Sequence, residues 1–229
     1  MNGEKILRER LSRNWEQTVA AAKLKVSQPY LSLIEAGKRP LTEKLARRAV
    51  RVFNLPPTAL PIKESSDAAG KKAKAGDLLA SQLASLGYPK FSHLKKTEKI
   101  NPAEVLIQAL KTGDIDSRTV EALLWLAYNF ADMDWSKIFR HAKLHDAQNR
   151  LGFLLSLARC AAETKSDAKK KEIFKELLAT LDESKLLRED AFNRQSLTET
   201  EKVWLKKNRS RDARHWRVLS NLSAEHLVF

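Results

Sequence analysis

Two histidines in the second half of the chain have the spacing of a metal-binding pair. His141 and His145 are four residues apart, so a helix would place both imidazoles on one face. A zinc site needs at least a third protein ligand, and no HExxH pattern accompanies these histidines. We therefore expect a pair of surface histidines and no bound metal.

Two carboxylates, Asp132 and Asp134, are the other candidates for catalysis or metal binding. They come just before Trp135, where a turn and the N-cap of a helix require short acidic side chains. The sequence has no glycine-rich phosphate-binding loop, nucleophile elbow or Cys-His arrangement that would complete an active site. We expect no enzyme and no cofactor, and a nucleic-acid-processing enzyme using these carboxylates and histidines is a distant alternative.

The composition favours a helical protein with a buried core. Hydrophobic residues make up 43% and charged residues 31% of the 229 residues, and only 7 Gly and 7 Pro occur. Leu, Ala, Lys and Glu are plentiful, which predicts an all-α protein. The single cysteine, Cys160, lies in an apolar run and is expected to be a small core residue outside any disulfide.

The net charge indicates a polyanionic partner. The 42 Lys and Arg exceed the 28 Asp and Glu and give a formal charge of +14, for which nucleic acid is the first candidate and a membrane surface the second. The longest apolar runs fall far short of the roughly 18 residues that span a bilayer. The first 14 residues are charged and lack the apolar segment of a signal peptide, so we expect a cytoplasmic protein without membrane contact.

The charge is distributed in blocks that suggest two domains. Residues 1–60 carry 12 basic and 5 acidic side chains, and residues 202–217 carry 7 basic and 1 acidic. Between them, residues 77–201 are balanced, while residues 61–76 are rich in Ser, Ala, Gly and Lys and read as a flexible linker. We therefore expect a DNA-binding domain over 1–60, a linker over 61–76 and a helical domain over 77–229.

The first of these segments has the pattern of two crossing helices joined by a tight turn. A small residue, Ala21, permits a close crossing, and Leu24, Val26, Leu31 and Ile34 supply its apolar side. The pattern consists of Gln17, Ala21, Leu24, Val26, Ser27, Gln28, Tyr30, Leu31, Ser32, Ile34, Glu35, Gly37, Lys38, Arg39 and Pro40, followed by Leu45, Ala46, Phe53, Leu55 and Pro56. With these residues, segment 6–60 resembles the five-helix helix-turn-helix domain of phage-repressor and Cro (Xre-like) regulators.

That resemblance implies a recognition helix that begins at Gln28 and enters the major groove of double-stranded DNA. We expect Gln28 to read a base directly, because a Gln amide pairs bidentately with adenine, with Ser32 second and Leu33 against a thymine methyl. Gln17 is expected to meet phosphate from the start of the preceding helix. The remaining expected DNA-binding residues are Ser27, which also caps the recognition helix, and Tyr30, Lys38 and Arg39.

Two positions depart from the family pattern. Lys25 stands where the inter-helix turn commonly has Gly, so either Lys25 adopts a positive φ or the turn has a different shape. Pro29 lies in the first turn of the recognition helix, where its missing N–H is harmless but where a base-reading side chain is lost.

The rest of the chain reads as a series of helices. Their predicted starts are Asp77, Asn101 before Pro102, Ser117, Asp134 and the Thr198–Glu201 capping box, and their predicted ends include Gly87 and Gly113. Residues 151–162 are apolar on most sides, which predicts a central helix. The last residues, 218–229, are ambiguous.

Short motifs spread over residues 78–227 are similar to Xre-like proteins encoded beside abortive-infection (AbiEii-type) nucleotidyltransferase toxins. They lie at 86–89, 101–104, 120–126, 134–135, 142–153, 208–210, 215–216 and 225–227. The similarity implies an antitoxin that represses its own operon and restrains a toxin protein by contact. It carries over no toxin-contact residue.

Part of this region can equally be explained by packing. Asn149 and Arg150 are suited to satisfy backbone groups at a helix junction, with Gly152 permitting close approach, while Trp125 and Trp135 read as core or half-buried aromatics. The basic tail, 202–217, either grips DNA or an acidic protein surface, or is a solvated face whose tryptophans fix it to the core.

Together these patterns predict a transcriptional repressor that binds paired half-sites as a homodimer, because one short helix contacts too few bases. A role as the antitoxin of a toxin-antitoxin system is the preferred setting. A stand-alone or phage-type repressor whose C-terminal domain senses a ligand or dimerises is the alternative.

Overall fold

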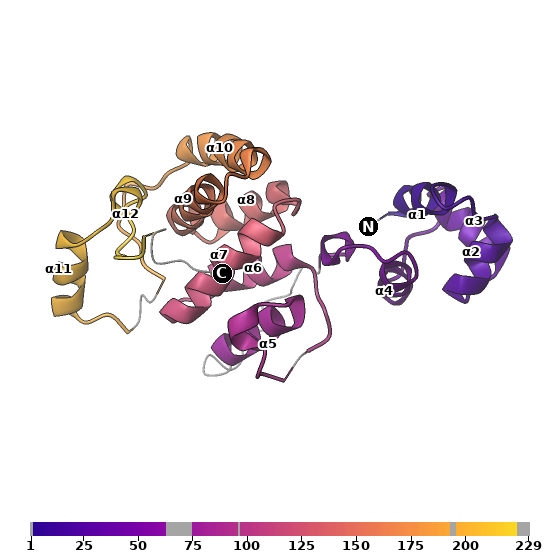
Figure 1. The fold of residues 1–229 in the computed structure, drawn as a ribbon, viewed down its shortest axis with the longest axis horizontal. Helices are drawn as coiled ribbons and strands as arrows, with labels where there is room; N and C mark the ends of the chain where they lie inside the picture. Colours follow the sequence, from indigo (N-terminus) through magenta and orange to yellow (C-terminus); the bar gives the residue numbers. More distant parts are fainter. Residues whose placement is uncertain (1, 63–74, 96, 193–195, 224–229) are drawn as a thin grey trace. The chain divides into compact units, whose positions relative to one another are not determined.

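The computed structural model describes residues 2–62, 75–95, 97–192 and 196–223 (Figure 1). The chain forms two compact units, residues 1–64 and 65–229, here called the N-terminal and C-terminal units. The described residues are helical apart from turns, loops and isolated bridge residues, among them the parallel pair Asp190 and Val218, which confirms the all-α prediction. Most of the predicted linker, 63–74, lies outside the described residues.

Four α-helices and one short 3₁₀ helix form the N-terminal unit. They are α1 (Gly3–Leu11), α2 (Gln17–Leu24), α3 (Gln28–Glu35), α4 (Glu43–Val52) and the 3₁₀ helix η1 (Pro57–Ala59). The side chains of Asn2, Ser27 and Thr42 cap α1, α3 and α4 by accepting a backbone N–H. The five expected helices are therefore present, with the last as a single 3₁₀ turn.

The apolar residues of the helix-turn-helix pattern form the core of this unit. Buried members of the core are Ile6, Ala20, Ala21, Leu24, Leu31, Ile34, Leu45, Ala49 and Phe53. At the edge of the core, a Cβ on Gly3 would lie 1.8 Å from the carbonyl oxygen of Ile34. Glycine is therefore required for α1 to pack against the end of α3, a constraint that sequence reasoning missed.

A long buried helix organises the C-terminal unit. The elements are α5 (Ala75–Leu86), the 3₁₀ helix η3 (Pro89–Phe91), α6 (Pro102–Lys111), α7 (Ser117–Asn129), α8 (Trp135–Leu144), α9 (Gln148–Thr164), α10 (Ala168–Asp182), α11 (Glu199–Lys207) and α12 (Arg211–His215). Helix α9 packs against α7, α8, α10 and α12, which confirms the predicted central helix.

Most predicted helix starts are confirmed, and two boundaries are wrong. Asn101 and Asp134 each accept a backbone N–H as N-caps, and the Thr198–Glu201 capping box is complete. Asp77 does not cap its helix, because α5 already begins at Ala75. Gly113 does not end α6 either: that helix stops at Lys111, where Thr112 adopts an extended backbone.

Asn149 uses its buried amide to hold a loop. Its Nδ2 donates to the carbonyl oxygens of Leu186 (3.0 Å) and Arg188 (3.1 Å), and its Oδ1 accepts the N–H of Leu186 (2.9 Å). These bonds satisfy backbone groups of the segment after α10, which is the structural role predicted for this residue.

Arg150 satisfies backbone carbonyl groups at the C-terminal end of α6. Its guanidinium donates to the carbonyl oxygens of Leu110 (2.8 Å) and Thr112 (3.1 Å), and its Nε lies 3.2 Å from Oδ2 of Asp190. Because Arg150 and Asp190 are both buried, the pair joins α6 and the segment before α11 to the central helix.

The ring of Trp216 packs against α9 at Gly152. A Cβ on Gly152 would lie 2.3 Å from the ring of Trp216, whose Nε1–H donates to Oγ of Ser156 at 2.8 Å. Trp216 is only 2% exposed, so this tryptophan fixes the end of the basic tail to the core. Trp204, in contrast, is 53% exposed and anchors nothing in the described structure.

Two smaller expectations concern Cys160 and the membrane. Cys160 is only partly buried and its Sγ lies 3.8 Å from Oδ2 of Asp212, so the expectation of a core cysteine is wrong. Across the described residues, no helix has the length and apolar character needed to cross a membrane.

Candidate DNA-binding surface

The turn between α2 and α3 is built on a non-glycine residue in the left-handed region. Lys25 has φ 51° and ψ 50°, so the first of the two possibilities for this position is confirmed. The N–H groups of Lys25 and Val26 donate to the carbonyls of Ala22 and Ala21, both at 3.0 Å. These bonds close the C-terminus of α2 in the way that a glycine normally does.

Arg48, on α4, supports this turn from outside. Its Nη1 donates to the carbonyl oxygen of Leu24 at 2.6 Å and lies 3.3 Å from that of Lys25. A guanidinium at the C-terminus of a helix satisfies carbonyls that have no partner in the helix and is favoured by the helix dipole. The sequence analysis did not identify Arg48 as a residue that supports the turn. A basic residue among the apolar positions of α4 is a weak signal of such a role.

The first turn of α3 is capped by a side chain and begins with exposed residues. Ser27 has an extended backbone and its Oγ accepts the N–H of Tyr30 at 3.4 Å. Pro29 occupies the first turn, where no intrahelical N–H is needed. Gln28 therefore begins the helix on a constrained backbone with its side chain exposed.

A chain of hydrogen bonds runs from the core to Gln28. Arg10 donates from Nε and Nη2 to the two carboxylate oxygens of Glu35, at 2.8 and 3.1 Å. Gln17 donates from Nε2 to Oε2 of Glu35 at 2.9 Å, and Gln28 donates from Nε2 to Oε1 of Gln17 at 2.5 Å. Glu35 is only 9% exposed, and its hydrogen bond raises the pKa of Arg10.

The order of donors along this chain is fixed by the carboxylate. An ionised Glu35 can only accept, so the amide nitrogen of Gln17 must face it and the amide oxygen of Gln17 must face Gln28. Gln28 then uses one amide N–H in its hydrogen bond to Gln17. Its second N–H and its carbonyl oxygen take no part in that bond. Those two groups are the ones that a bidentate contact with adenine requires.

The other residues predicted to contact DNA differ in how far their side chains are exposed. Ser32 and Tyr30 are partly buried, whereas Leu33 is 38% exposed. Lys38 and Arg39 are exposed just after α3, where both N–H groups donate to the Leu33 carbonyl oxygen at 2.8 and 3.1 Å. Helix α3 thus separates Gln28 from this basic pair by about 10 Å of helix axis.

Aromatic rings orient two of the basic side chains. The Arg39 guanidinium lies 5.5 Å from the centroid of the Tyr30 ring, and the Lys23 ammonium lies 4.8 Å from that of Trp15. Such cation–π contacts restrict long side chains while leaving their charge available to solvent or to an anion.

The two histidines that are four residues apart, His141 and His145, lie next to each other in the C-terminal unit. The rings of His141 and His145 are stacked, with centroids 6.2 Å apart and planes inclined by 8°. Within the ranges that the structure describes, no three His, Cys, Asp or Glu side chains are grouped so that they could hold a metal ion. Asp134 serves as the N-cap of α8, as expected.

Comparison with known proteins agrees with the geometry of the N-terminal unit. Residues 5–60 match the family model described as a helix-turn-helix. The match covers the α-helices of the N-terminal unit except for the first two residues of α1. No curated protein and no solved structure matches the chain. The N-terminal unit is a helix-turn-helix domain, and the match supports a DNA-binding transcription regulator.

Proposed function

We propose that the protein is a sequence-specific transcriptional repressor that places α3 in the major groove of its operator. The observation that carries this proposal is the hydrogen-bonded chain from Arg10 through Glu35 and Gln17 to Gln28. A base-reading side chain loses less conformational entropy on binding when its free conformation is already the bound one. Gln28 is held in this way and presents one donor and one acceptor.

The phosphate contacts come from groups around α3. Gln17 retains one amide N–H that does not face Glu35, and the exposed side chains of Lys38 and Arg39 add two positive charges at the other end of the helix. Ser27 and Tyr30 add hydroxyl groups near the start of α3. These contacts position the domain on the duplex, whereas Gln28 and Ser32 distinguish bases.

The active species is a homodimer on two half-sites. Helix α3 has eight residues, and only its first turns reach base edges, so a single copy reads too few base pairs for a genomic site. Two copies related by a twofold axis would require half-sites about one helical turn apart.

The first experiment is the selection of bound duplexes from a random DNA library by the full chain, followed by fluorescence anisotropy on the selected site. The expected result is a palindrome with two chains bound per duplex and at least a hundredfold preference over a scrambled duplex. Failure to enrich any sequence would contradict sequence-specific repression.

A finer proposal is that this repressor is an antitoxin that autoregulates its operon. Its support is the similarity of motifs over residues 78–227 to proteins encoded beside nucleotidyltransferase toxins, together with a C-terminal unit that is compact by itself. The roles of Asn149 and Arg150 within that unit indicate that these motif residues maintain the fold. Toxin contacts are therefore to be sought on the exposed surface.

The antitoxin proposal is tested by purifying the tagged full chain from its native cells after nuclease treatment and identifying partners by mass spectrometry. A stoichiometric protein partner whose expression is toxic without this chain is the expected result. Recovery of promoter DNA alone before nuclease, and of no protein after it, would make the protein a stand-alone repressor.

A further inference from the structure

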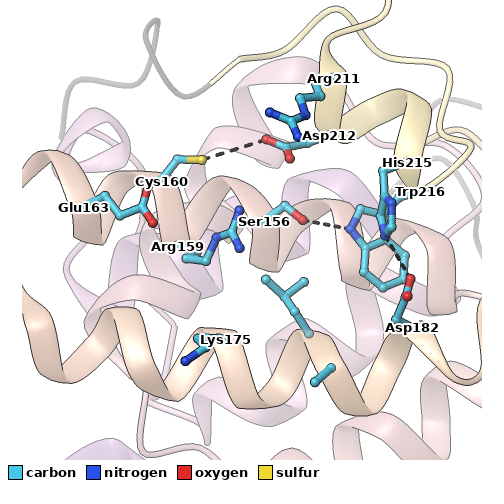
Figure 2. A pocket seen from close by; sticks show the side chains of 12 residues that line it. Ser156, Arg159, Cys160, Glu163, Lys175, Asp182, Arg211, Asp212, His215 and Trp216 are labelled. Atoms are coloured by element: carbon cyan, nitrogen blue, oxygen red, sulfur yellow. Dashed lines mark hydrogen bonds and ion pairs between the residues drawn. The ribbon is translucent and has the colours of Figure 1, made fainter.

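A pocket of about 600 Å³ opens between α9, α10 and α12 in the C-terminal unit (Figure 2). Three basic side chains line it from three helices: Arg159 from α9, Lys175 from α10 and Arg211 from α12. Leu178 and Trp216 supply apolar lining. Pockets of a few hundred cubic ångströms with an apolar wall and a few converging polar groups are typical of small-molecule sites.

The carboxylates at the rim of this pocket already have partners. Asp182 accepts hydrogen bonds from Lys185 at 3.0 Å and from His215 at 2.8 Å, and these contacts lower its pKa. Glu163 lies 3.4 Å from the ammonium of Lys171. Neither carboxylate is therefore available to neutralise Arg159 or Arg211, whereas Lys175 already has a partner in Glu172, whose Oε1 lies 2.9 Å from its ammonium.

The two arginines of the pocket lack such partners. Among the residues that the structure describes, neither Arg159 nor Arg211 forms an ion pair, and the buried Nε of Arg159 has no hydrogen-bond acceptor. A buried donor without an acceptor is destabilising, so an anion that accepts from it is favoured. Asp212 is the remaining carboxylate of the pocket and lies 3.8 Å from the Cys160 thiol.

The cysteine in this pocket is unsuited to covalent chemistry. Burial raises the pKa of the Cys160 thiol, and the nearby negative charge of Asp212 raises it further, against a smaller opposing effect of the Arg159 guanidinium. A thiol that stays protonated at neutral pH is a weak nucleophile. The groups that remain for chemistry are the arginines, whose forked donors match carboxylate and phosphate oxygens.

We propose that this pocket binds a small organic anion, whose carboxylate or phosphate oxygens are held by Arg159 and Arg211 and whose apolar part lies against Leu178 and Trp216. Lys175 lines the exposed side of the pocket, where its ammonium is paired with Glu172. The site lies wholly within the C-terminal unit and does not depend on the DNA-binding proposal.

Binding at this site has a structural consequence. Arg159 and Lys175 belong to the packed α9–α10 pair. Arg211 lies on α12, which is attached to α9 through the Trp216 ring above Gly152 and through the contact of Asp212 with Cys160. A ligand held by all three helices would tie α12 more firmly to the central helix. The C-terminal unit is therefore stabilised by the anion, with a shift that grows with ligand concentration.

The test is isothermal titration calorimetry of the full chain with three probes: inorganic phosphate, citrate and adenosine 5′-monophosphate. Each probe is also titrated against Arg159→Gln, Arg211→Gln and the matched control Arg214→Gln. Arg214 lies on the same short helix as Arg211, is exposed and does not line the pocket, so the change in net charge is identical. Circular dichroism on every variant establishes that it is folded.

At least one probe should bind the unaltered chain with a dissociation constant below 1 mM, on the order of a site with two charge-assisted contacts. Arg159→Gln and Arg211→Gln should each weaken that binding at least tenfold, while Arg214→Gln stays within twofold. Comparison of the dissociation constants of phosphate, citrate and the nucleotide shows which class of anion the pocket prefers. Equal weakening by Arg214→Gln, or no binding of any probe, would overturn the proposal.

Discussion

The side-chain amide of Gln28 donates to Oε1 of Gln17 across the turn of the helix-turn-helix, at 2.5 Å. The two residues are the first of α3 and the first of α2, so this bond joins the starts of both helices. Gln17 is in turn held by the buried carboxylate of Glu35. A buried ion pair thus determines which way the exposed amide of Gln28 faces.

Gln28→Ala should weaken binding to the selected operator by about 1–3 kcal/mol, because the bidentate base contact is lost. Binding to a scrambled duplex should change less than twofold, since phosphate contacts carry it. Fluorescence anisotropy on both duplexes measures the two effects. Ser12→Ala, at the exposed end of α1, is the control. Equal losses on operator and scrambled DNA would remove Gln28 from base readout.

Glu35→Gln should destabilise the N-terminal unit by about 3 kcal/mol, because Arg10 would keep its charge in a largely buried place without a carboxylate. Glu43→Gln removes a partly exposed i,i+4 pair with Arg47 and should cost less than about 1 kcal/mol. Native-state hydrogen exchange of α2 and α4 amides gives the local free energies of opening. A Glu35→Gln effect as small as that of Glu43→Gln would contradict this account.

The sequence was sufficient to predict the helix-turn-helix but not the network behind it. The apolar spacing around Ala21 and Leu24 defines two crossing helices, and Ser27 marks the start of the second. The pairing of Arg10 with Glu35 depends on how α1 meets α3, which no local pattern encodes. One signal was present: Glu35 follows Gln28 by seven residues and so lies on nearly the same face of the helix.

Lys25, in the turn between α2 and α3, has a strained backbone conformation whose energetic cost can be measured. Its left-handed backbone costs a non-glycine residue about 1 kcal/mol. Lys25→Gly should therefore stabilise the N-terminal unit by about 0.5–1 kcal/mol. Lys23→Gly, inside the last turn of α2, should instead destabilise it by about 1 kcal/mol. Hydrogen exchange of α2 and α3 measures both, and destabilisation by Lys25→Gly would show that the turn relies on the lysine side chain.

Lys38→Ala combined with Arg39→Ala should weaken operator and scrambled DNA alike. Removal of two phosphate contacts should make the slope of log K against log salt shallower by about 2. The control is Lys5→Ala with Arg8→Ala, which removes the same charge from α1 and should leave the slope nearly unchanged. The slope is obtained from anisotropy titrations over a range of salt concentrations. An unchanged slope in the Lys38 and Arg39 variant would place the phosphate contacts elsewhere.

In the C-terminal unit, caps and the central helix followed from the sequence, whereas long-range partners did not. Asp134 and Thr198 are identifiable because capping acts within one helical turn. Asn149 and Arg150 were assigned a backbone-satisfying role, but their acceptors lie about 40 residues away in either direction, at Arg188 and Leu110. The attachment of Trp216 to Gly152 likewise joins segments whose proximity only the fold establishes.

Gly152→Ala tests whether that attachment holds the basic tail. The added Cβ would lie 2.3 Å from the buried Trp216 ring, so either the ring or α12 must move. Overpacking of this kind costs about 1–3 kcal/mol, and hydrogen exchange should increase in α12 and the middle of α9. Gly76→Ala is the control, because a Cβ there has no neighbour within 4 Å and alanine favours the helix. If Gly152→Ala left the exchange of α12 unchanged, Trp216 would not be what fixes the tail.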